Sequence, residues 1–254
     1  LTLFWQAEKD LTNDYDVHVV LLDAQERVVA RSSGGPVDGR YPTSLWHAQE
    51  LVRDQREIRI PAATPSGELT VLVSAGDGET TAKTARVQVV GREHSFLRPT
   101  VAHPLDLTFG GIADLVGYEL EAPLRSGDGS TSEPGSVTAI VPGETLTLTL
   151  YWRARATTEC DWTVFTHLLD GAGRMWGQVD NKPGGGSLPT TGWVPGEYLI
   201  DRYVIPVKPD APEGDLALEV GMYDHLTGRR LSLTDSHGRL LEDSVVLTHV
   251  VVRR

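Results

Sequence analysis

The chain has 254 residues, which is long enough for two domains with separate hydrophobic cores. Its 35 acidic residues against 23 basic ones argue against nucleic acid or an anionic membrane surface as a partner, because both attract basic proteins. The single cysteine, Cys160, excludes an intrachain disulfide. No apolar run approaches the ~18 residues of a membrane span, and no signal-peptide pattern occurs. Because the chain opens on Leu1 inside an apolar alternation, we expect a piece of a larger protein, with any membrane attachment in other parts of that protein.

Apolar and polar residues alternate with a period of two along most of the chain, which is typical of half-buried strands. No segment combines a helical period with helix caps over ~10 residues. Short strands punctuated by glycine and proline predict an all-β fold: a tandem of two immunoglobulin-like β-sandwich domains, with a jelly roll as the rival topology. The expected strands are 1–5, 16–23, 27–31, 56–61, 69–73, 86–90, 116–121, 146–152, 163–170, 174–180, 200–207, 216–222, 229–234 and 245–252.

The first part of the chain is repeated in the second. Residues 1–54 align without a gap to residues 148–201, at an offset of 147. A repeat of this length indicates a duplicated domain, because solenoid units are shorter. We therefore expect the same strand connectivity in both copies. The pairs shared by both copies include Trp5/Trp152, Asp14/Asp161, Leu22/Leu169, Asp23/Asp170, Thr43/Thr190, Trp46/Trp193, Glu50/Glu197 and Asp54/Asp201.

We place the first domain at 1–93, a linker at 94–108 and the second domain at 109–254, because two prolines and mixed polarity interrupt the alternation between the copies. The second copy has an additional first strand, 116–121, and a Gly/Ser/Pro-rich loop, 126–136. The first domain therefore appears without its first strand in this sequence.

The missing strand leaves an edge of Leu1–Trp5 unprotected, and exposed edges pair with other chains. We expect a crystal neighbour or the linker 94–108 to cover that edge. The second copy also ends in a longer hairpin, 223–244. The segments Asp23–Arg27 and Asp170–Arg174 predict tight hairpin turns in which the aspartate caps its own turn.

Motifs of nucleophilic catalysis, zinc proteases, phosphate-binding loops and dinucleotide-binding folds are absent from the sequence. The cluster 184–186 of three glycines lacks the lysine and the helix that phosphate binding needs, so we interpret it as a loop. Asp14, Asp16 and His18 alternate along one strand face, as metal ligands would. The second copy does not repeat this set, so we favour a solvated face and expect no metal. No serine or cysteine pairs recognisably with His167, for which we expect a structural hydrogen bond.

Both copies carry two carboxylates four residues apart, Glu50 and Asp54 in the first and Glu197 and Asp201 in the second. A glycoside hydrolase needs two carboxylates about 5–10 Å apart in a cleft. A catalytic pair repeated in both copies of a small sandwich, without elaborated loops, fits that requirement poorly. We therefore expect these groups to accept hydrogen bonds from loop backbone or to pair with neighbouring arginines.

The other duplicated element is a Pro-Thr-x-x-Trp loop that ends at Trp46 in the first copy and at Trp193 in the second. A loop tryptophan can stack on a sugar ring, as in carbohydrate-binding modules. It can also close the end of a sandwich, with its ring buried and its N–H satisfied. We favour the second role, because it explains why both copies keep the residue beside Pro-Thr.

The string LTLYWRA…DWTVFTHLLD…GQVDNKPGGGSLPTTGWVPGEYLIDRYVIPVKPDAPEGDLALEVGMYDHLTGRRL resembles a sandwich domain of GC-rich, often thermophilic bacteria. That domain stands at the C-terminal, extracytoplasmic end of membrane proteins similar to family 39 (protein-mannosyltransferase-like) glycosyltransferases. The resemblance is close over 109–252 and looser over 1–90. It implies an extracytoplasmic appendage without catalytic residues, since the sugar-transfer chemistry would belong to the membrane portion.

The sequence thus leads to the hypothesis of a non-catalytic accessory or interaction module that uses no cofactor and binds a glycan or another protein domain. The alternative is a carbohydrate-binding module in which Trp46, Trp193, Glu197 and Asp201 contact the sugar. Exposure of the two tryptophans separates these readings, because a stacking platform requires open rings.

Overall fold

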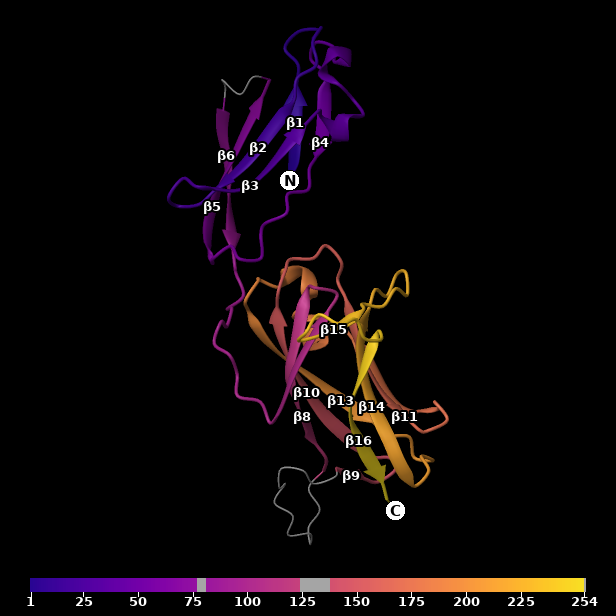
Figure 1. The fold of residues 1–254 in the computed structure, drawn as a ribbon. Coiled ribbons are helices and arrows are strands. Elements are labelled where there is room, and N and C mark those ends of the chain that lie inside the picture. The colour runs from indigo at the N-terminus through magenta and orange to yellow at the C-terminus, as the bar shows by residue number, and fades with distance from the viewer. Residues whose placement is uncertain (77–80, 124–137, 254) are drawn as a thin grey trace. The chain divides into compact units, whose positions relative to one another are not determined.

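The computed structural model describes residues 1–76, 81–123 and 138–253. Strands form nearly all of the regular structure in these ranges, beside four short 3-10 helices (Figure 1). The expected all-β class is therefore confirmed. The chain divides into two compact units, Leu1–Glu93 and His94–Arg254, which are described separately below. The expected loop 126–136 lies outside the described residues.

The first unit contains a two-stranded and a four-stranded sheet. Valines and leucines that alternate along β2 and β5 form its main core, and Leu3 and Trp5 of β1 pack against them. The smaller sheet pairs β1 (Thr2–Gln6) with β4 (Leu51–Gln55), and the larger has the order β3 (Val28–Gly34), β2 (Val17–Leu22), β5 (Gly67–Ala75), β6 (Thr81–Val89), with η1 (Val37–Gly39) and η2 (Thr43–Leu45) between β3 and β4.

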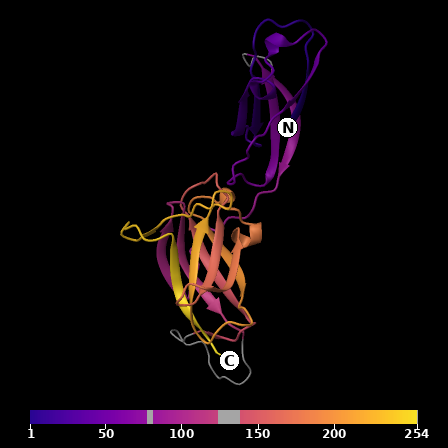
Figure 2. The same ribbon diagram turned by 90° about the vertical axis from the view of Figure 1, so that its right-hand side faces the viewer.

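The second unit has two five-stranded sheets with one core that takes residues from both, so it is a β-sandwich (Figure 2). Trp152 of β10 is fully buried in this core. The first sheet has the order β13 (Tyr198–Pro206), β10 (Thr145–Ala154), β8 (Ala113–Glu121), β7 (His103–Phe109), β15 (Leu233–Asp235). The second sheet has the order β12 (Met175–Asn181), β11 (Thr163–Leu169), β14 (Gly214–Tyr223), β16 (Ser244–Val252), β9 (Ala139–Ile140). In the chain, η3 (Pro183–Gly186) and η4 (Thr190–Gly192) lie between β12 and β13.

The strands that correspond at the offset of 147 residues are paired in the same way and in the same register. Leu3 lies opposite Asp54 in the β1–β4 pair, and Leu150 lies opposite Asp201 in the β10–β13 pair. The β2–β3 ladder has a register shift before Leu22, and the β11–β12 ladder has one before the equivalent Leu169. The connectivity of these strands is therefore the same in both units.

Residues 94–108, which we expected to form a linker, belong to the second unit. Ser95 bridges to Tyr198, and β7 pairs with β8 on one side and with β15 on the other. Pro104 interrupts the alternation but is tolerated inside β7, because β15 pairs only with the last residues of that strand and leaves Pro104 on an edge.

The strand expected at 56–61 is also absent; the strand at this place is β4, which ends at Gln55. The guanidinium of Arg56 is buried and donates hydrogen bonds to the carbonyls of Gly34 and Gly35 at 2.9 and 3.0 Å. The expected alternation itself continues, since Ile58 and Ile60 pack against the core while their neighbours are exposed, but the β1–β4 ladder ends at Gln55. None of the helices in the described ranges has the length and apolar character to cross a membrane.

Candidate functional site

The tryptophans of the two Pro-Thr-x-x-Trp loops are buried, as expected: Trp46 is 5% exposed and Trp193 is 2% exposed. Their indole N–H groups donate to backbone carbonyls, Trp46 to Tyr41 over 3.3 Å and Trp193 to Leu188 over 2.9 Å. Both rings therefore pack inside their units, too deeply buried to form the open platform that stacking on a sugar requires.

The threonine of each loop binds the loop to the segment that leads into β11 in the second unit and into β2 in the first. The hydroxyl of Thr190 donates to the carbonyl of Cys160 and accepts the backbone N–H of Trp162, both over 2.9 Å. Thr43 makes the equivalent two bonds, over 2.8 Å, with Asn13 and Tyr15. Because the threonine hydroxyl and the indole N–H are hydrogen-bonded within the fold in both units, the loop has a structural role, which accounts for its presence in both copies.

The duplicated glutamates close the turn that follows each tryptophan. Glu197 is fully buried and accepts the backbone N–H of Val194 over 3.1 Å, and His94 lies 3.0 Å from the same oxygen. Glu50 accepts the equivalent N–H of His47, which is the main reason that its pKa is lowered. The expectation that these carboxylates accept hydrogen bonds from loop backbone is met.

The duplicated aspartates hold the loop between the two sheets of each unit. Asp201 is fully buried, and its Oδ1 accepts the N–H of Gly184 over 2.8 Å, as Asp54 accepts that of Val37 over 2.9 Å. Both loop residues have positive φ angles, 63° and 56°, which glycine adopts easily and valine does not. The glycine cluster 184–186 is thus a turn held by Asp201, in agreement with its interpretation as a loop.

The other candidates from the sequence do not assemble into a metal centre. His18 lies 2.9 Å from the hydroxyl of Ser33 and 3.2 Å from the carbonyl of Gly76, while Asp14 accepts the N–H of Ser44 over 3.1 Å. In the described ranges, no group of three or more His, Cys, Asp or Glu side chains is arranged to hold a metal ion.

A polar cluster lies on the outer face of β11, β12 and β14 in the second unit. His167 lies 3.2 Å from Oδ1 of Asp180 and 3.8 Å from Oε2 of Glu219, and its ring stacks on Phe165. Tyr223 donates to Oδ2 of Asp180 over 3.3 Å. The first unit lacks all of these residues, since the equivalent positions hold His18, Val20, Ser33, Leu72 and Gly76.

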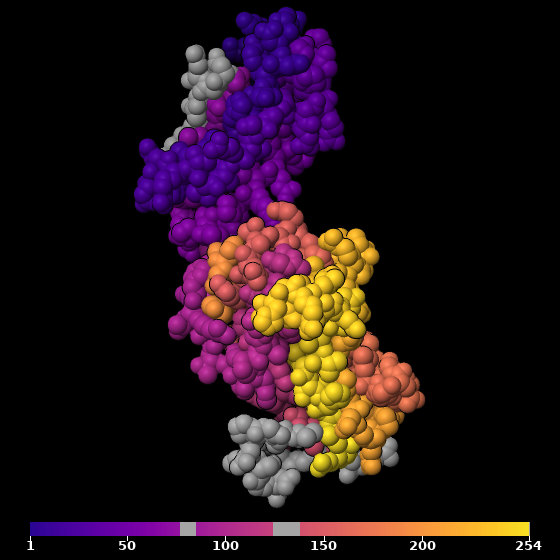
Figure 3. Space-filling view, in the orientation of Figure 1, coloured from indigo at the N-terminus to yellow at the C-terminus, as the bar shows by residue number. Residues whose placement is uncertain are grey.

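The long terminal hairpin of the second unit covers part of this cluster. The guanidinium of Arg230 lies 4.5 Å above the ring of Phe165 and 3.1 Å from Oδ1 of Asp243. Figure 3 shows these C-terminal residues, in yellow, across the surface of the second unit. The sequence identified the hairpin and His167, but not that the tertiary fold brings them together.

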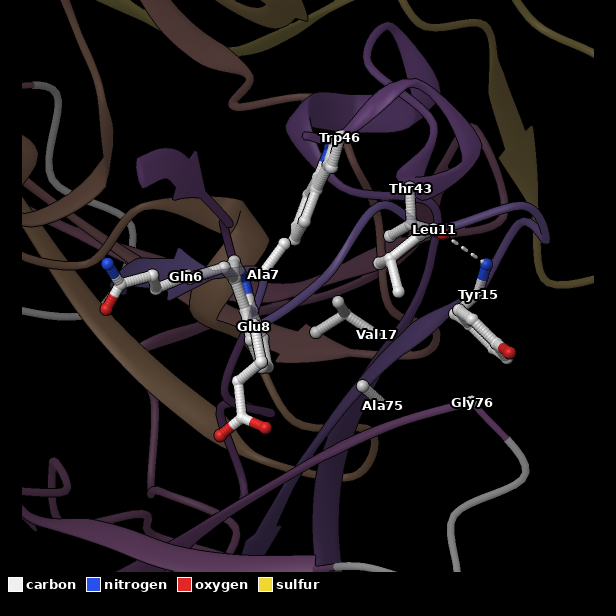
Figure 4. Close-up of a pocket in the computed structure, with 11 residues that line it drawn as sticks. Gln6, Ala7, Glu8, Leu11, Tyr15, Val17, Thr43, Trp46, Ala75 and Gly76 are labelled. Carbon is white, nitrogen blue, oxygen red and sulfur yellow. Dashed lines mark hydrogen bonds between the residues drawn. The ribbon is translucent and has the colours of Figure 1, made fainter. Parts of the chain in front are cut away.

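A cavity of about 350 Å³ opens at one end of the first unit (Figure 4). Gln6 and Glu8 lie on one side of it and Tyr15 on the other (Figure 4). The indole N–H of Trp5, also in the lining, is buried and has no hydrogen-bond partner among the described residues. The rest of the wall is mainly apolar and includes Ala7, Leu11, Val17, Trp46 and Ala75.

In the second unit the equivalent Trp152 is fully buried, and other side chains pack around it. Phe109 of β7 contacts Trp152 edge to face with ring centroids 5.2 Å apart, and Met222 is fully buried where the first unit has Ala75. The small Ala75 at the position of the large Met222 was a sequence signal for this difference in packing, but an alternation pattern alone does not identify a cavity.

The fold described above defines the chain as an all-β protein. No protein-family model matches it, and no curated protein matches it. Among solved structures 23 chains are similar. One is the crystal structure of the C-terminal domain of wzt, 12% identical, covering 60% of this chain and 83% of that chain with a TM-score of 0.35. These comparisons show no link to the family 39 glycosyltransferases.

Proposed function

We propose that the chain is a non-catalytic interaction module of a larger, membrane-embedded, glycosyltransferase-like protein, exposed outside the cytoplasm. In this proposal its two units are immunoglobulin-like sandwiches that arose by duplication of one domain. One observation carries the non-catalytic role: the duplicated carboxylates Glu197 and Asp201 are both fully buried and hydrogen-bonded to loop backbone. The extracytoplasmic location and the membrane-embedded parent are supported by the sequence resemblance alone.

The burial of this pair argues against the hydrolase reading of the same residues. A glycosidase acid must reach the glycosidic oxygen, and its partner must reach the sugar ring or a water molecule. Asp201 instead accepts hydrogen bonds from Gly184, Trp152 and Tyr203, so its oxygens are committed to the fold.

Hydrolysis of a panel of chromogenic glycosides by the intact chain tests the non-catalytic role. We expect no turnover above a buffer control. Turnover that Glu197→Gln abolishes while the unfolding midpoint stays unchanged would overturn the proposal. The open reading frame that encodes the chain tests the rest, because it should also encode membrane-spanning helices.

The carbohydrate-binding alternative requires a site other than the loop tryptophans, because Trp46 and Trp193 are buried. The observation that favours it is the cluster of His167, Asp180 and Tyr223, which stands on one sheet face of the second unit only. Polar side chains beside an aromatic ring are suited to sugar hydroxyls and ring faces. A glycan array with the intact chain and with Asp180→Ala, and Asp215→Ala as matched control, tests it: a sugar bound by wild type and control but not by Asp180→Ala would support this alternative.

A further inference from the structure

The turn at η1 in the first unit contains two residues other than glycine in the left-handed region of backbone conformation. Val37 has a φ of 56°, and Asp38 has a φ of 55° with a ψ of 35°. The equivalent residues of the second unit are Gly184 and Gly185, both with a φ of 63°. Left-handed backbone is unfavourable for residues with a Cβ, most of all for a β-branched valine, and is easy for glycine. The left-handed turn of the first unit, residues 35–40, is therefore strained, whereas its equivalent in the second unit is not.

A buried ion pair at the end of β4 contacts the left-handed turn. Asp54 and Arg56 lie 2.8 Å apart, with side chains that are 0% and 6% exposed. Oδ1 of Asp54 accepts the N–H of Val37 over 2.9 Å. The guanidinium of Arg56 donates to the carbonyls of Gly34 and Gly35, where the turn begins. Because opening the turn takes hydrogen bonds away from two buried charged groups, this pair favours the closed turn.

The side chains of the turn itself stabilise the closed conformation unequally. Val37 packs against the apolar cluster around Trp46, so burial offsets part of its backbone strain. Asp38 forms an ion pair with Arg40 over 3.0 Å, but the side chains are 70% and 76% exposed. Exposed ion pairs contribute little to stability, so the side chain of Asp38 offsets little of its backbone strain. The closed turn therefore depends on the hydrogen bonds that the Asp54–Arg56 pair makes with it.

The second unit differs from the first in both features. Tyr203 occupies the position of Arg56, and its hydroxyl donates to Oδ2 of Asp201 over 2.6 Å. A phenol has one proton to donate, so this side chain has no second donor for the carbonyls of the turn. The strained residues and an arginine with several donors thus occur together in the first unit, while glycines and a tyrosine occur together in the second.

We propose that residues 35–40 form a two-state segment that opens locally while both sheets of the first unit stay folded, and that the Asp54–Arg56 pair controls how often it opens. Strained backbone at Val37 and Asp38 raises the population of the open state, and the hydrogen bonds from the pair lower it. Opening breaks the bond between Val37 and Asp54 and takes the Val37 side chain off the apolar cluster around Trp46. In the second unit the unstrained turn opens far less often.

Native-state hydrogen exchange of the intact chain, followed by NMR, measures the local opening. The reporter amides of the first unit are the hydrogen-bonded N–H groups of Val37 and Arg40, and their equivalents are those of Gly184 and Ser187. After correction for intrinsic exchange rates, we expect opening constants about tenfold higher in the first turn than in the second. They should also exceed those of the β5 amides, which exchange when the whole unit unfolds. Equal opening constants in the two turns, or a Val37 amide that exchanges no faster than those of β5, would overturn the proposal.

Two matched variants change the strain in opposite directions. Asp38→Gly relieves it in the first unit and should lower the opening constants of Val37 and Arg40 about fivefold. Gly185→Asp places the same residue at the equivalent position of the second unit, where an added Cβ has open space, and should raise the opening constant of Gly184 about fivefold. The amides of β5 and β14 should not change in either variant. A shift of the same sign in both turns, or no shift, contradicts the role of the strain.

Arg56→Lys tests the controlling pair. Lysine keeps the positive charge but lacks the fork of donors that reaches Asp54 and both carbonyls at once. We expect the opening constants of Val37 and Arg40 to rise about tenfold, and Asp38→Gly in the same chain to reverse part of that rise. If Arg56→Lys instead raises the exchange of β5 as much as that of the turn, Arg56 supports the whole unit, and the proposed control of the turn is wrong.

Discussion

The indole N–H of Trp152 donates a hydrogen bond to Oδ2 of Asp201 over 3.2 Å, inside the core of the second unit. The same pair exists in the first unit as Trp5 and Asp54, but there Oδ2 of Asp54 accepts a hydrogen bond from Arg56 over 2.8 Å. Trp5 has a buried N–H without a partner among the described residues. The position of Arg56 holds Tyr203 in the second unit, and there Oδ2 of Asp201 accepts hydrogen bonds from both Tyr203 and Trp152.

Replacing each of these tryptophans by phenylalanine should separate the two environments. Trp152→Phe removes a buried hydrogen bond and leaves Asp201 with one donor fewer, whereas Trp5→Phe removes an unpaired donor. We expect Trp152→Phe to lower the free energy of unfolding by about 1–2 kcal/mol more than Trp5→Phe does. Calorimetric unfolding of the intact chain measures both, and equal losses would contradict this account of Trp5.

Asp201 should make stability depend on pH in a direction that is unusual for an aspartate. Burial raises its pKa above the ordinary value of 3.8, although Tyr203, Gly184 and Trp152 donate to it. The folded state then holds this proton more tightly than the unfolded state does. The contribution of Asp201 is therefore largest at low pH and decreases as the pH rises from 3.8 through the raised pKa.

Urea denaturation of wild type and of Asp201→Asn across this pH range measures the effect. The difference in free energy of unfolding between them should shrink as the pH rises, because asparagine does not titrate. A difference that grows with pH would show that the three hydrogen bonds outweigh the burial of the carboxyl group.

Trp193→Ala should lower the free energy of unfolding by about 3–5 kcal/mol, because the substitution leaves a cavity the size of an indole in a packed core. Thr190→Val, which removes only the hydroxyl that bonds to Cys160 and Trp162, should cost less. Thermal unfolding measures both. If Trp193→Ala unfolds like wild type but loses a sugar that wild type binds, the structural role of Trp193 is wrong.

Asp170 and Asp23, which cap equivalent hairpin turns, should differ in how far their pKa values are lowered. Asp170 has a pKa lowered to about 2, chiefly because the indole of Trp176 donates to it. Asp23 caps the equivalent turn and has a lowered pKa without such an indole, because Val29 occupies the position of Trp176. Asp170 therefore stabilises the fold above pH 3.8, and this contribution is lost as the pH falls through about 2.

Carboxyl NMR titration of the chain reports both aspartates directly. In Trp176→Phe the pKa of Asp170 should rise towards that of Asp23, and the pKa of Asp23 should not move. An unchanged Asp170 in this variant would assign its low pKa to the backbone N–H groups of the turn.

Several features of the candidate sites were predictable from the sequence because they depend on neighbouring residues. Alternation along a strand is set by the geometry of extended backbone, so the β2 and β14 strands follow from their residues. The Asp-x-x-x-Arg turns are also local, and Oδ1 of Asp170 accepts the N–H groups of Ala172 and Arg174 as expected. Shared loop chemistry in both copies likewise indicated that Trp46 and Trp193 are buried.

Only the tertiary structure decided the pairing and burial that depend on strands far apart in the sequence. Residues 94–108 looked like a linker, yet those from His103 onward belong to β7, which pairs with β8. Trp5 and Trp152 share a sequence context, but Phe109 of β7 contacts Trp152, and no described residue of the first unit contacts Trp5 in the same way. The sequence by itself determined the strands and their common order, because extended backbone and turns are local. Only the assembled fold decided which edge, cavity and buried N–H remain open, because these depend on contacts between residues far apart in the chain.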